Sequence, residues 1–283
     1  MTIVVTGARG KIGRALMPSL PDVPVRALGR TSSPQFDWAE QATWDGALEG
    51  VEQLFLLVPG GDDGHRDVSS EVANATAFVD RAVNAGAERI VMLSALGVNQ
   101  APDDVPMRAL ELHVQASAPS WTIVRPNWFF QNFTDGPLAD LITAGDGQLR
   151  APLEQAQVSY VDAVDVGQVC AAALLDNGHH EQAYDLTGPV ALNPDEVADA
   201  FARGSSHVAG SAWSYRHLDE AVFRTEVKDL GWDDAYIDTV CGLFAMMRAG
   251  WAAHVTDDVE RVLGRPARSL EDFAAGRQRL GRA

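Results

Sequence analysis

The sequence predicts an α/β fold in which a doubly wound parallel sheet is followed by a smaller, mainly helical carboxyl-terminal portion. Short apolar runs alternate with helical patterns through the first half of the chain, an order typical of parallel strands joined by crossover helices. The apolar runs are nearly continuous, which indicates strands that are buried on both faces of the sheet. Beyond Pro189 helical patterns dominate, and they predict the second portion.

The predicted strands and helices alternate along the chain. The first strand is expected to start at Thr2, and the others to occupy Val23–Leu28, Gln53–Val58, Arg89–Leu93, Trp121–Val124, Val158–Tyr160 and Ala183–Leu186, the last of which returns to the main sheet. The predicted helices are one from Ile12, one from Val72 to Val83 after a polar loop at residues 60–67, and Val164–Leu175, Pro194–Ala202, Asp219–Leu230, Asp233–Trp251, Asp257–Leu263 and Leu270–Leu280. We expect residues 1–154 to form the sheet domain, residues 155–190 to return partly to its sheet, and residues 191–283 to form the helical portion.

A glycine-rich turn follows the first apolar run and reads Thr6-Gly7-Ala8-Arg9-Gly10-Lys11-Ile12-Gly13. In a dinucleotide-binding turn with this GxxGxxG spacing, Gly7 allows the tight turn, Gly10 lets the backbone approach a pyrophosphate, and Gly13 lets the helix pack on the strand. The helix N-terminus offers N–H groups and the positive end of its dipole to the phosphates, and Arg9 and Lys11 add charge. The turn therefore predicts a Rossmann-type NAD(P)-binding domain; a glycine-rich turn without a ligand is the alternative.

The carboxyl ends of parallel strands meet at one edge of the sheet, where folds of this kind bind their ligand. The remaining predicted cofactor-binding residues come from these ends: Arg30, Asp37, Leu57, Val58, Pro59, Ser94, Ala95, Pro126, Asn127, Trp128 and Phe129. Asp37 is expected near the adenine. At the position of Arg30 an acid would bind the 2′-hydroxyl of NAD, whereas an arginine suits the 2′-phosphate of NADP. We therefore expect NADPH to be preferred, with NAD as the second option; a solvated surface role for Arg30 is the alternative.

Composition and charge exclude several classes of partner. The chain has 283 residues and a formal net charge of −17, which argues against nucleic acid or an anionic membrane surface as partner. Cys170 and Cys241 lie in apolar helical contexts, which predicts buried, reduced thiols, and the pair His179 and His180 has no further ligand at metal-site spacing. No apolar run has membrane-spanning length, and no signal peptide precedes the first strand. We expect a cytoplasmic protein without a metal site, and its oligomeric state stays open.

Motifs spread along nearly the whole chain resemble one known family. Besides the glycine turn they are Ala47-Leu-Glu-Gly-Val-Glu-Gln-Leu-Phe-Leu-Leu-Val-Pro59, Ile90-Val-Met-Leu-Ser-Ala95, Trp121-Thr-Ile-Val-Arg-Pro-Asn-Trp-Phe-Phe-Gln-Asn-Phe133, Tyr160-Val-Asp-Ala-Val-Asp-Val-Gly167, Tyr184-Asp-Leu-Thr-Gly-Pro189 and Leu263-Gly-Arg-Pro266. The combination resembles the NmrA-like group of atypical short-chain dehydrogenases, which includes bacterial NAD(P)H:quinone oxidoreductases. The resemblance implies a Rossmann domain, a nicotinamide cofactor and a small carboxyl-terminal substrate-binding portion. Members of the group reduce quinones, sense redox state without turnover, or tailor aromatic natural products.

The chain departs from short-chain dehydrogenases at the positions of their catalytic pair. Those enzymes place a tyrosine and a lysine four residues apart on a helix, and the matching helix here carries Met107 and Glu111. Methionine cannot donate a proton, so acid catalysis of that kind is absent. His113 on the same helix is the one candidate acid, with a structural histidine as the alternative, and we leave the catalytic residues unassigned.

Aromatic side chains supply most of the predicted substrate site. The segment from Trp128 to Phe133 carries four aromatic residues, Phe129 among them, which either stack a flat substrate or form core. The helix at Asp233–Trp251 has an apolar stripe at helical spacing that ends at Trp251, and we interpret this stripe as core, with a binding lip as the alternative. The predicted substrate-binding residues are Met107, Trp128, Phe130, Phe133 and Phe244.

These observations predict an oxidoreductase that transfers hydride from NAD(P)H to a quinone or a quinone-like aromatic substrate. Reduction of such a strong hydride acceptor requires positioning more than an acid, which agrees with Met107 at the tyrosine position. Two alternatives stay open. The protein is a dinucleotide-binding redox sensor without turnover, or it is a reductase or oxygenase that tailors aromatic polyketides.

Overall fold

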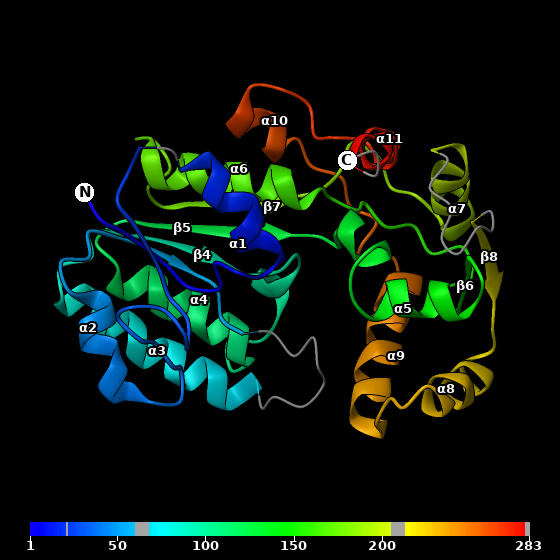
Figure 1. Ribbon diagram of the computed structural model, residues 1–283, viewed down its shortest axis with the longest axis horizontal. Coiled ribbons are helices and arrows are strands. Elements are labelled where there is room, and N and C mark those ends of the chain that lie inside the picture. Colours follow the sequence, from blue (N-terminus) through cyan, green and yellow to red (C-terminus); the bar gives the residue numbers. More distant parts are fainter. Residues whose placement is uncertain (21, 60–67, 205–212, 281–283) are drawn as a thin grey trace.

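Six parallel strands form the sheet of the amino-terminal domain, in the order β2-β1-β3-β4-β5-β7 (Figure 1). The computed structural model describes residues 1–20, 22–59, 68–204 and 213–280, and the loop predicted at residues 60–67 lies outside them. The strands are β1 Ile3–Val5, β2 Val25–Ala27, β3 Gln53–Leu56, β4 Arg89–Leu93, β5 Trp121–Pro126 and β7 Gln182–Leu186. Because every neighbouring pair is parallel and β7 returns to pair with β5, the predicted doubly wound sheet is confirmed.

Helices cover both faces of this sheet (Figure 1). One face carries α1 Lys11–Leu16, α6 Ala163–Leu175 and α10 Asp258–Leu263, and the other carries α2 Trp44–Leu48, α3 Val68–Asn84 and α4 Pro106–Ser117. Successive strand residues point to opposite faces, so Val5 and Phe55 pack under α1 and α6, whereas Val4 and Leu54 pack under α3 and α4. This two-sided burial explains why the strand sequences are nearly continuous apolar runs.

The strand expected at Val158–Tyr160 does not form. Its backbone groups bond to three different segments: Val158 bridges Leu192, the Ser159 N–H donates to the Ala252 carbonyl over 2.9 Å, and the Val161 N–H donates to the Trp128 carbonyl over 2.8 Å. No continuous ladder with one neighbour results. The segment instead joins the sheet domain to the carboxyl-terminal portion.

The carboxyl-terminal portion is mainly helical, as expected. It contains α5 Pro137–Ala144, α7 Pro194–Arg203, α8 Glu220–Asp229, α9 Asp234–Arg248 and α11 Leu270–Leu280, and also a two-stranded parallel sheet of β6 Gln148–Ala151 and β8 Ser214–His217 that the sequence analysis missed. Short 3-10 turns complete the structure: η1 Met17–Ser19, η2 Gln41–Thr43, η3 Val98–Gln100 and η4 Phe130–Phe133. The buried side chains between Phe130 and Leu153 pack into the core of this portion, although the division expected at residue 154 had grouped them with the sheet.

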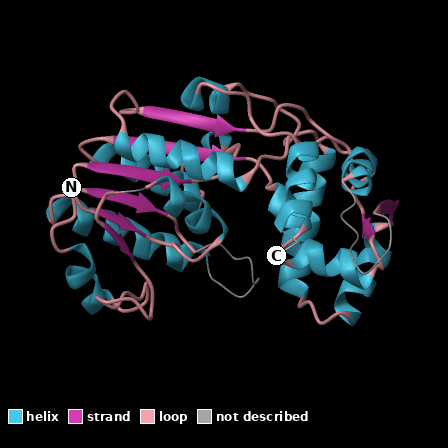
Figure 2. Cartoon of the chain, turned by 45° about the horizontal axis from the view of Figure 1, so that its top comes forward, coloured by secondary structure: helices cyan, strands magenta, loops and turns pink. Residues whose placement is uncertain are grey.

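The strands point their carboxyl ends toward the helical portion (Figure 2). The loops that follow β1, β2, β3, β4 and β5 therefore face the second portion of the chain, and a ligand at this edge lies between the two. Both cysteines are buried and unbridged, which confirms their prediction. Among the residues that the structure describes, no helix is long and apolar enough to cross a membrane.

Candidate functional site

The glycine turn between β1 and α1 has a separate structural reason for each glycine. Gly7 has φ +66°, and a Cβ there would lie 2.5 Å from the Leu57 Cδ2 atom. A Cβ on Gly13 would lie 2.3 Å from the Gly7 carbonyl oxygen, so α1 can pack on the turn only without a side chain at this position. Gly10 differs, because its Cβ would meet only the Gly7 oxygen, at 3.3 Å, and the residue is exposed. Gly10 is therefore the glycine whose open side faces solvent and an incoming ligand.

The N-terminus of α1 is open toward this side. Gly10 is its N-cap, no side chain of the described residues caps it, and no acidic residue lies in the first turn. The first N–H groups of a helix have no partner within the helix, and together with the helix dipole they attract an anion. These features fit the pyrophosphate of a dinucleotide. The Ile12 side chain is buried between α1 and the sheet, so Ile12 can contribute only its backbone.

Thr6 positions the neighbouring strand end and does not offer its hydroxyl to a ligand. The residue is fully buried. Its Oγ1 accepts a hydrogen bond from the Leu57 N–H over 2.7 Å and lies 3.0 Å from the Leu57 carbonyl, to which it donates. The Thr6 side chain is therefore engaged within the protein, and the predicted part of Thr6 in holding the pyrophosphate stays a prediction. Its physical role is to fix the end of β3 beside the glycine turn, where Val58 is buried and Leu57 and Pro59 are partly exposed.

Two exposed arginines stand at the ends of β1 and β2. Arg9 Nη1 donates to Thr31 Oγ1 over 2.6 Å and so joins the two loops, and Arg30 directly precedes Thr31. Two guanidinium groups at this corner suit a phosphate, which they can bind bidentately. Asp37 lies farther along the same loop. Its carboxylate accepts from the Ala39 N–H over 2.9 Å, so it shapes a turn, and its predicted place near the adenine stays a prediction.

Lys11 connects the glycine turn to the loop after β5. Its Nζ donates to Asn132 Oδ1 over 2.6 Å and lies 5.8 Å from the centroid of the Phe129 ring. Phe129 and Trp128 are partly exposed at this edge. Asn127, by contrast, is buried, and its amide nitrogen donates to Ser159 Oγ and to the Ala252 carbonyl, both over 2.8 Å. The Asn127 side chain therefore holds other segments in place, and its predicted place among the cofactor-binding residues stays a prediction.

Three of the predicted substrate-binding residues belong to the core of the helical portion. Phe130 and Phe244 are each 1% exposed and Phe133 is 2% exposed. Their ring faces contact other aromatic rings: Phe130 stacks on Phe273 at 5.6 Å, and Phe244 lies 5.6 Å from Phe223. Their burial favours the core alternative for these three residues, and their assignment to the substrate stays a prediction. Met107 and Trp128 keep partly exposed side chains.

Glu111, at the position of the catalytic lysine of short-chain dehydrogenases, lies in a buried ion pair. Both its carboxylate oxygens accept from Arg125 of β5, over 2.7 and 2.8 Å, and Arg108 adds a third bond over 3.1 Å. Burial alone would raise the pKa of the Glu111 carboxyl, but the hydrogen bonds and the charge of Arg125 outweigh it and hold that pKa below its ordinary value. Glu111 is therefore a fixed anion that ties α4 to β5. The signal in the sequence was a charged residue, Arg125, inside an apolar strand.

Ser94, at the end of β4, lies at the edge of this ion pair. It is 9% exposed. Its hydroxyl is close enough to Glu111 to help lower the pKa of that carboxyl, yet it has no hydrogen-bond geometry to any described residue. Ala95, the next residue, is exposed. The Ser94 Oγ atom is buried against the ion pair, and the predicted place of Ser94 and Ala95 beside the ribose and nicotinamide stays a prediction.

His113 does not face the strand ends. Its Nε2 lies 2.7 Å from Asp80 Oδ1 on α3, and Ser117 Oγ lies 3.3 Å from the same nitrogen. The side chain therefore links α4 to α3 in the helical layer that covers the sheet. This position supports the structural alternative for His113, and it does not supply an acid to the candidate site.

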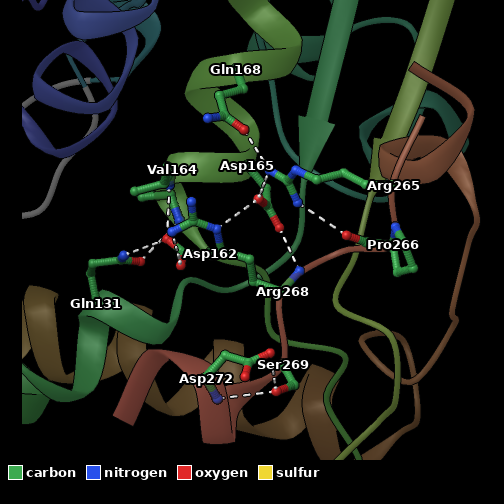
Figure 3. Close-up of polar contacts among 11 residues, drawn as sticks. Gln131, Asp162, Val164, Asp165, Gln168, Arg265, Pro266, Arg268, Ser269 and Asp272 are labelled. Atoms are coloured by element: carbon green, nitrogen blue, oxygen red, sulfur yellow. Dashed lines mark hydrogen bonds and ion pairs between the residues drawn. The ribbon is translucent and has the colours of Figure 1, made fainter. Parts of the chain in front are cut away.

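A second buried polar cluster joins η4 to the carboxyl-terminal segment (Figure 3). Asp165 of α6 is fully buried and accepts from Arg265 Nη2 and from the Arg268 N–H, each over 2.7 Å. Asp162 accepts from Gln131 Nε2 over 2.8 Å and caps α6 at the Val164 N–H. The cluster was not predicted, because its members are about 100 residues apart in the sequence. It fixes η4, and with it the loop of Trp128 and Phe129.

Known proteins share the sequence and the architecture of this chain. A family model described as NAD(P)H-binding matches residues 7–177. The NAD(P)H azoreductase of Xenophilus azovorans is 31% identical over 291 residues, which covers 96% of each chain. The crystal structure of the NADPH-dependent quinone oxidoreductase QOR2 from Escherichia coli has a TM-score of 0.76 at 20% identity and covers 98% of this chain and 99% of that one.

The solved structure of NmrA, a negative transcriptional regulator in complex with NADP, has a TM-score of 0.71 at 17% identity and covers 97% of this chain and 94% of that chain. The resemblance to the NmrA-like group is thereby confirmed in fold, and the predicted cofactor class is confirmed by the family match. The open N-terminus of α1, the exposed Gly10 and the two arginines fit the phosphates of that cofactor. Matched by the family model over most of its sheet domain and by a relative along nearly its whole length, this chain belongs to the NAD(P)H-binding family.

Proposed function

We propose that this NAD(P)H-dependent oxidoreductase uses NADPH to reduce a flat, conjugated acceptor, namely a quinone or an azo compound. The single observation that carries the proposal is the state of the catalytic-pair positions. Met107 has no proton to donate, and Glu111 is held as a carboxylate by Arg125 and Arg108. An acceptor that takes hydride without a side-chain acid suits such a site.

The residues at the strand ends bind and orient both reactants. Gly10 and the α1 N-terminus bind the pyrophosphate, and Arg9 and Arg30 bind the 2′-phosphate. When bound, the nicotinamide would supply a hydride, which carries both electrons, and the one proton that completes the reduced acceptor would come from water. The partly exposed Trp128 and Phe129 shield the ring from solvent on one side, so the chain contributes proximity and exclusion of water.

The names of the relatives support the acceptor class. An azoreductase is 31% identical to this chain, and a quinone oxidoreductase shares its fold. Azo dyes and quinones are both planar, conjugated and readily reduced by two electrons. They therefore form one chemical class of acceptor for one site.

The test measures oxidation of NADPH by the purified protein with benzoquinone, a naphthoquinone and an azo dye, through the loss of NADPH absorbance. Gly10→Val serves as the matched control for the background reaction, because it should remain folded and lose the cofactor. We expect turnover with at least one of these acceptors. Tight binding of NADPH without oxidation by any of them would refute the proposal and favour a redox sensor.

A further inference from the structure

The Trp251 side chain is exposed, unlike most residues of the apolar stripe that was predicted to end at this position. Phe244 and Met247 on α9 are 1% and 2% exposed, as core residues should be, whereas Trp251 is 52% exposed. Met246, which precedes Met247 in the chain, is 49% exposed. Single exposed apolar residues are common on protein surfaces, so the location of Trp251 decides whether its exposure matters.

The way in which α9 ends explains why the Trp251 side chain is exposed. The helix ends at Arg248, and Gly250 has φ +85°. The Gly250 N–H donates to the Met247 carbonyl over 2.9 Å, and the Trp251 N–H donates to the Met246 carbonyl over 3.2 Å. These two bonds form a Schellman motif, which ends a helix and sets the residue after the glycine beside the residue that accepts its N–H. The backbones of Trp251 and Met246 are therefore joined by a hydrogen bond, and both side chains are about half exposed.

The turn that carries Trp251 is held against the carboxyl ends of β4 and β5. The Asn127 amide, just after β5, donates to the carbonyl of Ala252, the next residue after Trp251. A Cβ on Gly97, just after β4, would lie 4.0 Å from the Trp251 ring. The Leu96 N–H donates to the Pro126 carbonyl over 3.0 Å, so these two strand ends are themselves adjacent. The indole therefore borders the loop that follows Ser94 and Ala95.

We propose that Trp251 binds the acceptor by stacking and determines the preference of the enzyme for extended, flat acceptors. The inference rests on the proposed function, since it assigns the acceptor-binding wall of that same site. The occupant is argued from the position of the indole beside Gly97, at the strand ends where the proposed function places the nicotinamide, and from the flat, apolar face that a half-exposed indole offers to a ring. A half-exposed indole gains stacking and apolar burial when a second aromatic ring covers it.

The test compares Trp251→Ala and Trp251→Phe with the unmodified protein, using a naphthoquinone and an azo dye as extended acceptors and benzoquinone as the small one. We expect Trp251→Ala to raise KM for the extended acceptors about tenfold, and Trp251→Phe to restore most of the affinity. The KM for benzoquinone should change less, and the Kd for NADPH should stay the same. Leu230→Ala is the matched control, because Leu230 is also 52% exposed but ends α8.

The outcomes distinguish this inference from the proposed function. If the unmodified protein binds NADPH but reduces no acceptor, the proposed function fails and the role of Trp251 fails with it. If the unmodified protein is active and Trp251→Ala keeps the KM values for extended acceptors, only the role of Trp251 is refuted. A change in oligomeric state in Trp251→Ala, seen by size-exclusion chromatography with light scattering, would also refute it, because a second copy of the chain would then cover the indole.

Discussion

Alanine substitutions at Gly13 and Gly10 should separate folding from cofactor binding. A Cβ on Gly13 would lie 2.3 Å from the Gly7 oxygen and 2.4 Å from the Ala8 Cα. Both neighbours are backbone atoms, so no side-chain rotation relieves the overlap and α1 must move away from the turn. Overpacking of this kind costs about 1–3 kcal/mol. For a chain of this size that corresponds to a fall in Tm of about 2–6 °C.

Gly10→Ala should have the opposite profile. Gly10 has φ −75° and ψ 179°, a conformation open to any residue, and its Cβ would meet only the Gly7 oxygen at 3.3 Å. The loss of stability should be about 1 kcal/mol or less, since alanine is a poorer N-cap than glycine. The methyl group projects where the pyrophosphate approaches. Losing one charge-assisted hydrogen bond there costs about 1.5–3 kcal/mol, which weakens NADPH binding about 10- to 100-fold.

Fluorescence titration with NADPH and thermal melting followed by circular dichroism measure the two effects. Gly276→Ala is the matched control, because its Cβ would have no neighbour within 4 Å and the residue lies in α11. That variant should bind NADPH normally and melt at the same temperature or slightly higher. The reasoning is refuted if Gly10→Ala binds NADPH as well as the unmodified protein, or if Gly13→Ala melts at the unmodified temperature.

Three further predictions concern charged side chains. Arg30→Ala should reduce the affinity for NADPH about tenfold and leave that for NADH nearly unchanged, and equal titration curves of the unmodified protein with both cofactors would contradict this. Glu111→Gln should destabilise the fold by about 3 kcal/mol, the lower end for a broken buried ion pair, because it leaves the buried Arg125 with Asp185, 3.5 Å away, as its remaining carboxylate partner; unfolding in urea measures this. The pKa of the Glu111 carboxyl is lowered in the folded state. Its contribution to the free energy of unfolding is therefore complete above the ordinary carboxyl pKa and disappears as the pH falls through the lowered pKa of the folded state. Glu111→Gln should therefore reduce the loss of stability at acid pH. His113→Ala should leave kcat and its pH profile unchanged, and loss of a bell-shaped profile in this variant would make His113 an acid after all.

The sheet was predictable because most of its strands can be identified from their own apolar residues. Runs such as Gln53–Leu56 and Arg89–Leu93 are buried on both faces and therefore read as continuous apolar sequence. The strands β6 and β8 carry little signal: Ser214–His217 is half polar, and its burial does not alternate. They pair with each other across 66 residues, and such a pairing is decided by packing and not by local sequence.

The site was predictable where one motif contains it and not where it depends on distant partners. The glycine turn is local, and Gly7 and Gly13 have the geometric reasons that their spacing indicated, whereas the approach of a pyrophosphate to Gly10 stays a prediction. The bond from Lys11 to Asn132 spans 121 residues, and the pair of Glu111 with Arg125 joins a helix to a strand. Neither pairing follows from the sequence alone. Thr6 and Asn127 also form hydrogen bonds to residues that are distant in the sequence. Their polar side chains suggested contacts with a ligand, but in the fold they bond to other groups of the protein.

The exposure of Phe244 and Trp251 is the reverse of what was predicted for them, since Phe244 is buried and Trp251 is half exposed. The end of the helix explains the difference. Helical spacing places both residues on one apolar stripe. Phe244 was predicted to bind the substrate, and Trp251 was predicted to lie in the core. Helical spacing holds only while the helix continues, and α9 ends at Arg248. The glycine at position 250, with φ +85°, turns the chain so that Trp251 leaves the stripe while Phe244 stays buried. An aromatic residue directly after a C-terminal glycine should therefore be assigned by the geometry of the cap, and here that geometry places the indole beside Gly97, in the loop after β4.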